Sequence, residues 1–328
     1  MIKKGNLTMN KKVYVTRRLP NSVMKLLGNI CEYDVNEEDR LSTREELING
    51  VKNYAAMITM LNDNIDADLI NQAGPDLKLI ANYGVGFNNI DVKAANAKGI
   101  YVSNTPDVLT DATADLAWTL IFAAARRVIE CDNLVRTGTF EWAPNFMLGY
   151  DVTGKTLGII GAGRIGENLG KKAALGFNMK VLYYGRHSSP ALEAVGGSRV
   201  GLEELLERSD FVSIHVPLTP ETRHLIGAEE LSKMKPDGIL INTSRGPVVD
   251  EKALADALSR HVIAGAGLDV YENEPEVEPA LKKLQNVVLM PHVGTGTFDT
   301  RKNMGILVIK NIEAVFAGHE PVNMVRVK

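Results

Sequence analysis

The chain has 328 residues, of which 45% are hydrophobic and 23% charged, and its net charge is -3. This length allows two domains that each bury a core, and the composition is typical of a soluble globular protein. Because the net charge is slightly negative and no run of five basic residues occurs, we expect no nucleic-acid partner.

The cysteines and the first residues bear on where the protein works. Cys31 and Cys131 lie far apart and outside any CxxC pattern, so we expect reduced thiols, a cytoplasmic location and no bound metal. Residues 1–10 lack the apolar region of a signal peptide and are expected to form a frayed tail. The longest apolar stretch, residues 112–125, contains Asp115 and is too short to span a bilayer, so no membrane partner is expected.

The first part of the chain alternates short apolar segments with amphipathic or turn-rich ones. Such alternation predicts a parallel sheet that is covered by helices. The expected strands are residues 13–16, 54–60, 77–82 and 100–103, and the expected helices include 43–49 and 91–97.

A long apolar helix is expected next, from Asp111 to Thr137. Asp111 is suited to the start of a helix, and Gly138 lies just beyond the end. A helix this apolar must be covered, either between domains or between subunits. We therefore expect a homodimer, because a monomer would expose too much of this surface.

The segment from residue 155 to 170 combines a buried strand at Leu157–Ile160 with a glycine-rich turn and a helix at Ile165–Leu175. In the pattern Gly161-x-Gly163-x-x-Gly166, the first glycine permits a tight turn and the second leaves room for a pyrophosphate. The third lets helix and strand pack closely. The helix amino terminus would then face the phosphates with free N–H groups and a partial positive charge.

The next strand, residues 180–184, completes a βαβ unit, and the residues after it indicate which dinucleotide is bound. An NAD site usually has an acidic residue there, which binds the ribose hydroxyls. This chain has Gly185, Arg186 and His187, followed by two serines. Because Arg186 can pair with a 2′-phosphate, we expect NADP(H) to be preferred, with NAD(H) also possible. The alternative is that Arg186 is only a solvated loop cation.

A second series of strands follows the glycine motif. The expected strands are residues 180–184, 211–216, 239–243, 263–269 and 287–290, and a returning helix is expected at 300–317. The fold class that follows is α/β, with two doubly wound parallel-sheet domains.

Seven ordered motifs resemble one enzyme family. They read NYGVGFNNID from Asn82, NTPDVLTD from Asn104, GAGRIG from Gly161, HVPLTPET from His215, INTSRGPVVD from Ile241, GLDVYENEP from Gly267 and PHVG from Pro291. Together they are similar to the D-isomer-specific 2-hydroxyacid dehydrogenase family, and most similar to its glyoxylate and hydroxypyruvate reductases. The resemblance covers nearly the whole chain and implies NADPH-dependent reduction of a short 2-oxo acid to the D-2-hydroxy acid.

The same resemblance implies a domain arrangement and a set of contacts. A discontinuous, flavodoxin-like substrate domain would comprise residues 1–107 and 291–328. A Rossmann cofactor domain would comprise residues 108–290, with a cleft between the two. The substrate contacts would be Val85, Gly86, Leu61 and Arg245. The cofactor contacts would be Gly161, Gly163, Arg164, Ile165, Gly166, Arg186, Val216, Pro217, Thr222, Thr243, Asp269 and Thr113.

Reduction of a 2-oxo acid needs a proton donor and a cation that holds the carboxylate. His292 is the candidate acid, because imidazole titrates near neutral pH and the family motif carries its catalytic histidine here. Glu274, which the resemblance assigns as its partner, would stabilise the protonated ring and fix its orientation. Arg245 can pair with a carboxylate in a planar, two-pronged way.

Two alternatives stay open. The substrate could be 2-ketogluconate or an aromatic 2-oxo acid, because the sequence does not show the size of the pocket. A dinucleotide-sensing binding protein, such as a corepressor of the same fold, is disfavoured because His292, Glu274 and Arg245 are all retained. The resemblance also suggests that Trp142 or Phe146 reaches the site of a neighbouring subunit.

Overall fold

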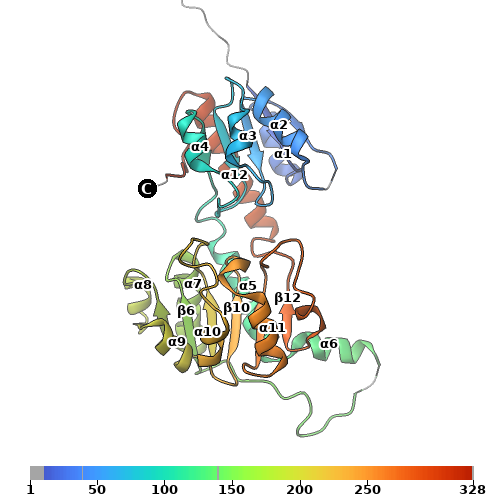
Figure 1. Ribbon diagram of the computed structural model, residues 1–328, viewed down its shortest axis with the longest axis vertical. Coiled ribbons are helices and arrows are strands. Elements are labelled where there is room, and N and C mark those ends of the chain that lie inside the picture. Colours follow the sequence, from blue (N-terminus) through green and yellow to red (C-terminus); the bar gives the residue numbers. More distant parts are fainter. Residues whose placement is uncertain (1–10, 39, 139, 327–328) are drawn as a thin grey trace, which may run out of the picture. The chain divides into compact units, whose positions relative to one another are not determined.

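The computed structural model describes residues 11–326 except 39 and 139, so the tail expected at residues 1–10 lies outside the described residues. The chain divides into two compact units, Met1–Leu109 with Gly296–Lys328 and Thr110–Thr295 (Figure 1). Each unit is a parallel sheet flanked by helices, which confirms the predicted fold class. Within the described part of the chain, no helix has the length and apolar character needed to cross a membrane.

The first unit has the strand order β2-β1-β3-β4-β5, which is that of flavodoxin-like folds. Its elements are β1 (Lys12–Val15), α1 (Asn21–Gly28), β2 (Glu32–Val35), α2 (Arg44–Asn53), β3 (Ala56–Thr59), α3 (Ala67–Asn71), β4 (Leu79–Asn82), α4 (Val92–Ala97), β5 (Tyr101–Ser103) and α12 (Phe298–Phe316). Helices α2, α3 and α4 share one apolar core with the sheet, whereas α12 packs against α1 and β4. The late helix α12 therefore completes a unit that begins at the other end of the chain.

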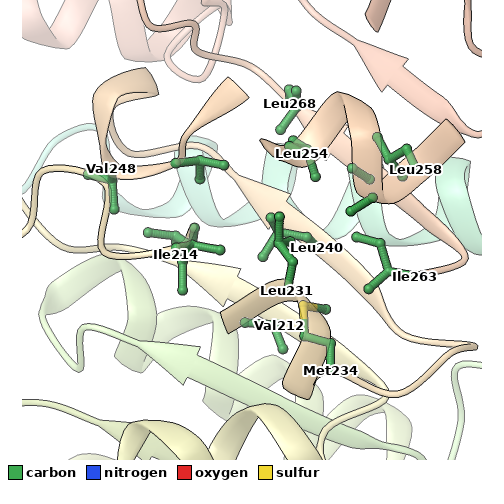
Figure 2. Packing of buried hydrophobic residues seen from close by; sticks show 14 of the residues in the cluster. Val212, Ile214, Leu231, Met234, Leu240, Val248, Leu254, Leu258, Ile263 and Leu268 are labelled. Atoms are coloured by element: carbon green, nitrogen blue, oxygen red, sulfur yellow. The ribbon is translucent and has the colours of Figure 1, made fainter. Parts of the chain in front are cut away.

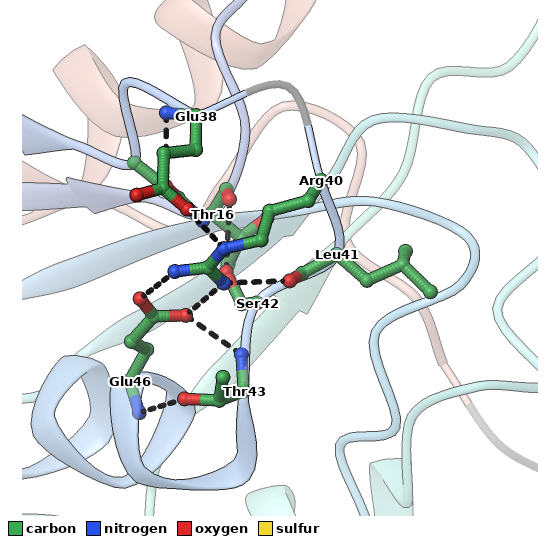
Figure 3. A network of polar contacts seen from close by, with 8 residues as sticks. Thr16, Glu38, Arg40, Leu41, Ser42, Thr43 and Glu46 are labelled. Atoms are coloured by element: carbon green, nitrogen blue, oxygen red, sulfur yellow. Dashed lines mark hydrogen bonds and ion pairs between the residues drawn. The ribbon is translucent and has the colours of Figure 1, made fainter.

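A polar network fixes the start of α2, as Figure 3 shows. The hydroxyl of Thr43 accepts the N–H of Glu46, and the carboxylate of Glu46 accepts the N–H of Thr43 at 2.7 Å, which forms a capping box. Arg40 binds both oxygens of Glu46, and these hydrogen bonds lower the pKa of Glu46 to about 2. Ser42 donates to the carbonyl of Thr16 at 2.9 Å, which ties this loop to the end of β1.

The second unit has seven parallel strands in the order β12-β11-β10-β9-β6-β7-β8. Its elements are α5 (Thr110–Ala125), α6 (Val128–Arg136), β6 (Thr156–Ile160), α7 (Arg164–Phe177), β7 (Lys180–Tyr184), α8 (Pro190–Glu193), β8 (Ser198–Arg199), α9 (Leu202–Arg208), β9 (Phe211–Ile214), α10 (Ala228–Lys233), β10 (Ile239–Asn242), η1 (Gly246–Val248), α11 (Glu251–Ser259), β11 (Gly265–Leu268), η2 (Leu281–Lys283) and β12 (Val287–Leu289). This is the dinucleotide-binding order with one further strand, and the order reverses at β6, directly before the glycine motif.

Two apolar layers cover the faces of this sheet. On one face, Leu231 of α10 and Leu254 of α11 pack against strand residues such as Leu240 (Figure 2). On the other face, α5 and α7 cover the sheet, and Trp118 stacks on Phe177 with ring centroids 4.6 Å apart. The central strands β9, β10 and β11 are buried on both faces, and such strands read as continuous runs of mostly apolar residues.

The prediction of a single helix from Asp111 to Thr137 is wrong. Helix α5 ends at Ala125, and Arg127 adopts φ +52°, in the left-handed region that a helix of L-residues cannot continue through. The carbonyl of Ala125 accepts the N–H of Tyr150 at 2.8 Å instead of an amide of the next helical turn. A returning segment of the chain therefore closes α5, and α6 is a separate helix.

The prediction that a monomer would expose too much apolar surface on this helix is wrong for α5. Most of its apolar side chains are buried in the core of its own unit. Several exposed apolar side chains instead lie in α6 and in the segment after it, where Val135 is 57% exposed, Trp142 78% and Leu148 62%. Residues 128–150, apart from position 139, therefore offer apolar surface to a second subunit.

The second boundary between the units lies after residue 295, beyond the predicted boundary at 290/291. Residues 291–295 stay with the second unit because the carboxylate of Asp269 accepts the N–H groups of Val293 at 2.7 Å and Gly294 at 2.8 Å. His292 therefore belongs to the same unit as the glycine motif.

Candidate active site

The predicted residues of the second unit gather at the edge where its parallel strands end, which is where α/β sheets present ligand groups. They come after the ends of six strands. Strand β6 is followed by Gly161, Gly163, Arg164, Ile165 and Gly166, β7 by Arg186, and β9 by Val216, Pro217 and Thr222. Strand β10 is followed by Thr243 and Arg245, β11 by Asp269 and Glu274, and β12 by His292. Thr113, in the first turn of α5, lies beside Gly294.

The glycine-rich turn is packed closely against neighbouring backbone at Gly161 and Gly166, but it is open at Gly163, where α7 starts. Gly161 has φ +103°, and a Cβ there would lie 2.7 Å from the carbonyl carbon of His215. A Cβ on Gly166 would overlap the carbonyl oxygen of Gly161. At Gly163, the N-cap of α7, a Cβ would meet no atom within 4 Å. The helix amino terminus therefore has room beside it for an anionic group.

Thr243 supplies a second indication of a bound ligand. Its side chain is buried, and its hydroxyl has no hydrogen-bond partner among the described residues. Buried hydroxyls are nearly always paired, so this one suits a ligand that would supply the missing partner. The hydroxyl of Thr222, in contrast, is already used, because it donates to the carbonyl of Pro217 at 2.6 Å. The unpaired hydroxyl of Thr243 and the open space at Gly163 together fit a bound dinucleotide.

Arg186 lies in an exposed loop whose backbone carbonyls accept hydrogen bonds from a residue of β8. Arg199 donates to the carbonyl of Gly185 at 2.8 Å and to that of Arg186 at 3.0 Å. The pKa of Glu221 is lowered, mainly by a hydrogen bond from Thr219 and also by the positive charge of Arg186. The Arg186 guanidinium thus lies at the end of β7, near one carboxylate.

His292 and Glu274 form a hydrogen-bonded pair, with 2.7 Å between Nδ1 and Oε2. The other carboxylate oxygen accepts the N–H of Tyr271 at 3.0 Å. Burial acts to raise the pKa of Glu274, but the hydrogen bond and charge of His292 help to outweigh it and lower the pKa. The Tyr271 amide and the charge of Arg245 lower this pKa further. The carboxylate is therefore ionised at neutral pH.

Gly246 brings Arg245 to the loop that carries Glu274. A Cβ on Gly246 would overlap the carbonyl carbon of Tyr271, so the two backbones pass in direct contact. The side-chain amide of Asn242 donates to the carbonyl of Arg245 at 3.0 Å, which fixes this turn. Burial lowers the pKa of Arg245, and the negative charge of Glu274 counteracts that effect. A guanidinium in this environment is suited to hold a carboxylate.

The predicted substrate residues of the first unit also lie close together. Leu61 follows β3, and its side chain packs on Gly84, where a Cβ would overlap Leu61 Cδ2. A Cβ at position 84 would therefore displace the end of the Leu61 side chain from its present position.

Two asparagines hold the neighbouring loop. Asn82 donates to the carbonyl of Gly86 at 2.6 Å, and Asn104 donates to the carbonyl of Val85 at 2.8 Å. With both carbonyls bound to side chains of the unit, the arrangement suits presentation of the Val85 and Gly86 N–H groups to an anion.

Residues that shape the site were missing from the prediction. The available signal for Gly246 was its place directly after Arg245, because a glycine beside a functional residue indicates close backbone approach. Tyr271 gave no such signal. Its hydroxyl donates to the carbonyl of Met290 at 2.8 Å, a contact between segments that are distant in sequence.

Comparison with known proteins gives three concordant matches. Residues 118–294 match the family described as D-isomer specific 2-hydroxyacid dehydrogenase, NAD binding domain. The chain is 49% identical over 323 residues to the glyoxylate reductase of Thermococcus litoralis, with 97% of each chain covered. Among solved structures, it is similar to a glyoxylate reductase from Paecilomyes thermophila, with 34% identity, a TM-score of 0.85 and coverage of 96% of this chain and 98% of that one.

A further similar structure contains a cofactor. It is the NADPH-dependent glyoxylate/hydroxypyruvate reductase of Sinorhizobium meliloti in complex with NADP and malonate, with 33% identity, a TM-score of 0.83 and coverage of 96% and 97%. The matches confirm the predicted family and enzyme class, and they support a nicotinamide dinucleotide as the cofactor. The chain is an oxidoreductase that belongs to the D-isomer specific 2-hydroxyacid dehydrogenase family.

Proposed function

We propose that the protein reduces a short 2-oxo acid, glyoxylate or hydroxypyruvate, to the D-2-hydroxy acid with NADPH. The observation that carries this proposal is the His292–Glu274 pair at 2.7 Å, with the Arg245 segment pressed against the same loop. The names of the relatives support the substrate class, because both the curated and the solved ones include glyoxylate reductases.

In the proposed reaction, a bound nicotinamide would supply the hydride to the carbonyl carbon of the substrate. Arg245 pairs with the substrate carboxylate and polarises the neighbouring carbonyl. His292 has its Nδ1 bound to Glu274, so its Nε2 donates the proton to the carbonyl oxygen as negative charge builds there. Glu274 holds the ring through this hydrogen bond and fixes its orientation.

We further propose that Val85, Gly86 and Leu61 contact the substrate. The N–H groups of Val85 and Gly86 suit a carboxylate, because the carbonyls on the same loop are held by asparagine side chains. Leu61 offers an apolar wall, which favours a short side chain on the substrate.

We propose NADPH as the preferred cofactor. The residues directly after β7 include Arg186 and no carboxylate, so this loop offers a 2′-phosphate an attractive charge. The similar reductase of Sinorhizobium meliloti, which is described as NADPH-dependent, supports this choice.

We propose a homodimer that works in the cytoplasm. The exposed apolar side chains in and after α6 support association, because isolated monomers rarely leave such side chains clustered in water. Cys31 and Cys131 are both free thiols, which suits a reducing compartment.

A substrate panel tests the proposed activity. Glyoxylate, hydroxypyruvate, 2-ketogluconate and phenylpyruvate are each offered with NADPH and with NADH, and the product is resolved on a chiral column. We expect the highest kcat/KM for glyoxylate or hydroxypyruvate with NADPH, and the D-isomer of glycerate from hydroxypyruvate. Binding of NADPH without turnover of any 2-oxo acid would instead support a dinucleotide-sensing protein.

A further inference from the structure

Glu251 is a buried carboxylate that the proposed reaction does not use. It is the first residue of α11, directly after the N-cap Asp250, and it is only 6% exposed. Its two oxygens accept the backbone N–H groups of Glu272 and, at 3.3 Å, of Glu278. These two hydrogen bonds bracket the loop that carries Glu274.

The helix itself does not require this arrangement. Asp250 already caps α11 by accepting the N–H of Ala253 at 3.0 Å. A carboxylate in the first turn of a helix can act on the helix dipole from the surface, without burial. Burial raises the pKa of Glu251, as do the charges of Glu272 and Glu278, while the two loop amides act to lower it. A carboxylate in such surroundings needs those two amides as partners.

The bracketed loop presents the proposed catalytic pair. Glu274 accepts the N–H of Tyr271 at 3.0 Å and lies 2.7 Å from Nδ1 of His292. A displacement of this loop would therefore move Glu274 away from the proposed proton donor.

We propose that Glu251 is a positioning residue, which holds the loop 272–278 so that Glu274 stays within hydrogen-bond distance of His292. This inference rests on the proposed function, because it has a consequence for turnover only if His292 is the proton donor. Small displacements matter here, since a 1 Å misplacement of a catalytic group can cost about 10²-fold in rate.

The test is Glu251→Gln, made in the wild-type chain and in a Glu274→Gln background. Glutamine keeps the size of the side chain but offers only one acceptor oxygen, so one of the two loop amides loses its partner. In the wild-type background we expect kcat/KM for glyoxylate to fall by about 10- to 100-fold. The fall of kcat/KM at acidic pH, which reports the Glu274 carboxylate, should also weaken, as it should in Glu274→Gln.

The Glu274→Gln background separates positioning from a general loss of structure. With no carboxylate left at position 274 to place, adding Glu251→Gln should cause less than about twofold further loss. Glu230→Gln is the matched control, because Glu230 also accepts a backbone N–H in the same unit, that of Gly227 at 3.1 Å. This variant should leave kcat/KM, the pH profile and the NADPH dissociation constant unchanged.

An equal loss in both backgrounds, or full activity of Glu251→Gln in the wild-type chain, would overturn the positioning role. If Glu251→Gln does not fold, Glu251→Asp replaces it. Aspartate keeps the charge but is shorter by one methylene, so it should show a smaller loss that again disappears in the Glu274→Gln background. A loss that persists there would equally overturn the role.

The same set of variants distinguishes a failure of this inference from a failure of the proposed function. Full activity of His292→Ala would refute the proton donor and, with it, the proposed function. If His292→Ala and Glu274→Gln both lose activity while Glu251→Gln keeps it, only the positioning role fails.

Discussion

At the scale of single residues, Arg245 has a chemistry that lysine cannot reproduce, because only the guanidinium offers a planar fork to a carboxylate. We expect Arg245→Lys to raise KM for glyoxylate and to lower kcat, with a combined loss of about 10²-fold in kcat/KM. Steady-state kinetics at saturating NADPH measure both changes. Arg208→Lys, at an exposed pair with Glu204, is the control and should behave as wild type. A normal KM and kcat in Arg245→Lys would contradict the role.

Arg186 should decide the cofactor preference. We expect Arg186→Ala to raise KM for NADPH by roughly tenfold or more, the effect of losing one charge-assisted hydrogen bond. KM for NADH should stay nearly unchanged, because NADH has no 2′-phosphate. Kinetics with each cofactor at saturating glyoxylate measure the two values. An equal rise for both cofactors would show that the arginine acts on something other than the 2′-phosphate.

At the scale of elements, the glycines of the turn between β6 and α7 have separable roles. A Cβ at position 163 has open space, so Gly163→Ala should fold with an unchanged Tm but should bind NADPH more weakly. A Cβ on Gly166 would overlap the carbonyl oxygen of Gly161, so Gly166→Ala should lose roughly 1–3 kcal/mol of stability. Thermal unfolding and NADPH titration of both variants check this. A large drop in Tm for Gly163→Ala would contradict it.

The elements differ in how far the sequence could predict them. Buried strands such as β6 and β10 have continuous apolar runs, so their existence and positions followed from the pattern alone. Strand β2, which reads EYDV and is half exposed, has no such run and was missed. The division between α5 and α6 was missed because it depends on the contact between Ala125 and Tyr150, which lie 25 residues apart in the printed sequence.

The candidate site likewise contains residues that the sequence could predict and contacts that it could not. Its motifs placed Arg245, Glu274 and His292 at strand ends, where parallel sheets bring them to one edge. The hydrogen bonds of Glu251 to the loop amides were not predictable, because a glutamate at the start of a helix is ordinarily a solvent-exposed residue. The sequence alone does not show which distant segments of the chain contact one another.

At the scale of the whole molecule, we expect a homodimer. Light scattering at micromolar concentration should give twice the chain mass of 35.8 kDa. Replacing Trp142 and Leu148 together by serine should weaken the association, because both side chains are exposed and apolar. Replacing the exposed Leu175 of α7 by serine is the control and should leave the mass unchanged. A single-chain mass for the wild-type protein would exclude the dimer.

The proton donor is the central claim, and the titration of its partner Glu274 fixes the sign of a pH effect. The pKa of Glu274 is lowered, so its carboxylate stays ionised and paired with His292 until the pH falls below the usual carboxyl range. The kcat/KM of the wild type should therefore fall at acidic pH, where this carboxylate is protonated. In Glu274→Gln no carboxylate is left to protonate at this position, so kcat/KM should be lower and this acidic fall should be absent.

The most direct measurement is the pH profile of kcat/KM for glyoxylate reduction in the wild type, Glu274→Gln and His292→Ala, with NADPH binding measured in parallel. We expect His292→Ala to lose about 10²–10⁴-fold in rate while it binds NADPH as the wild type does. We expect Glu274→Gln to have a lower kcat/KM and to lack the fall at acidic pH that reports the Glu274 carboxylate. Wild-type turnover in His292→Ala, or an unchanged acidic fall in Glu274→Gln, would contradict the account.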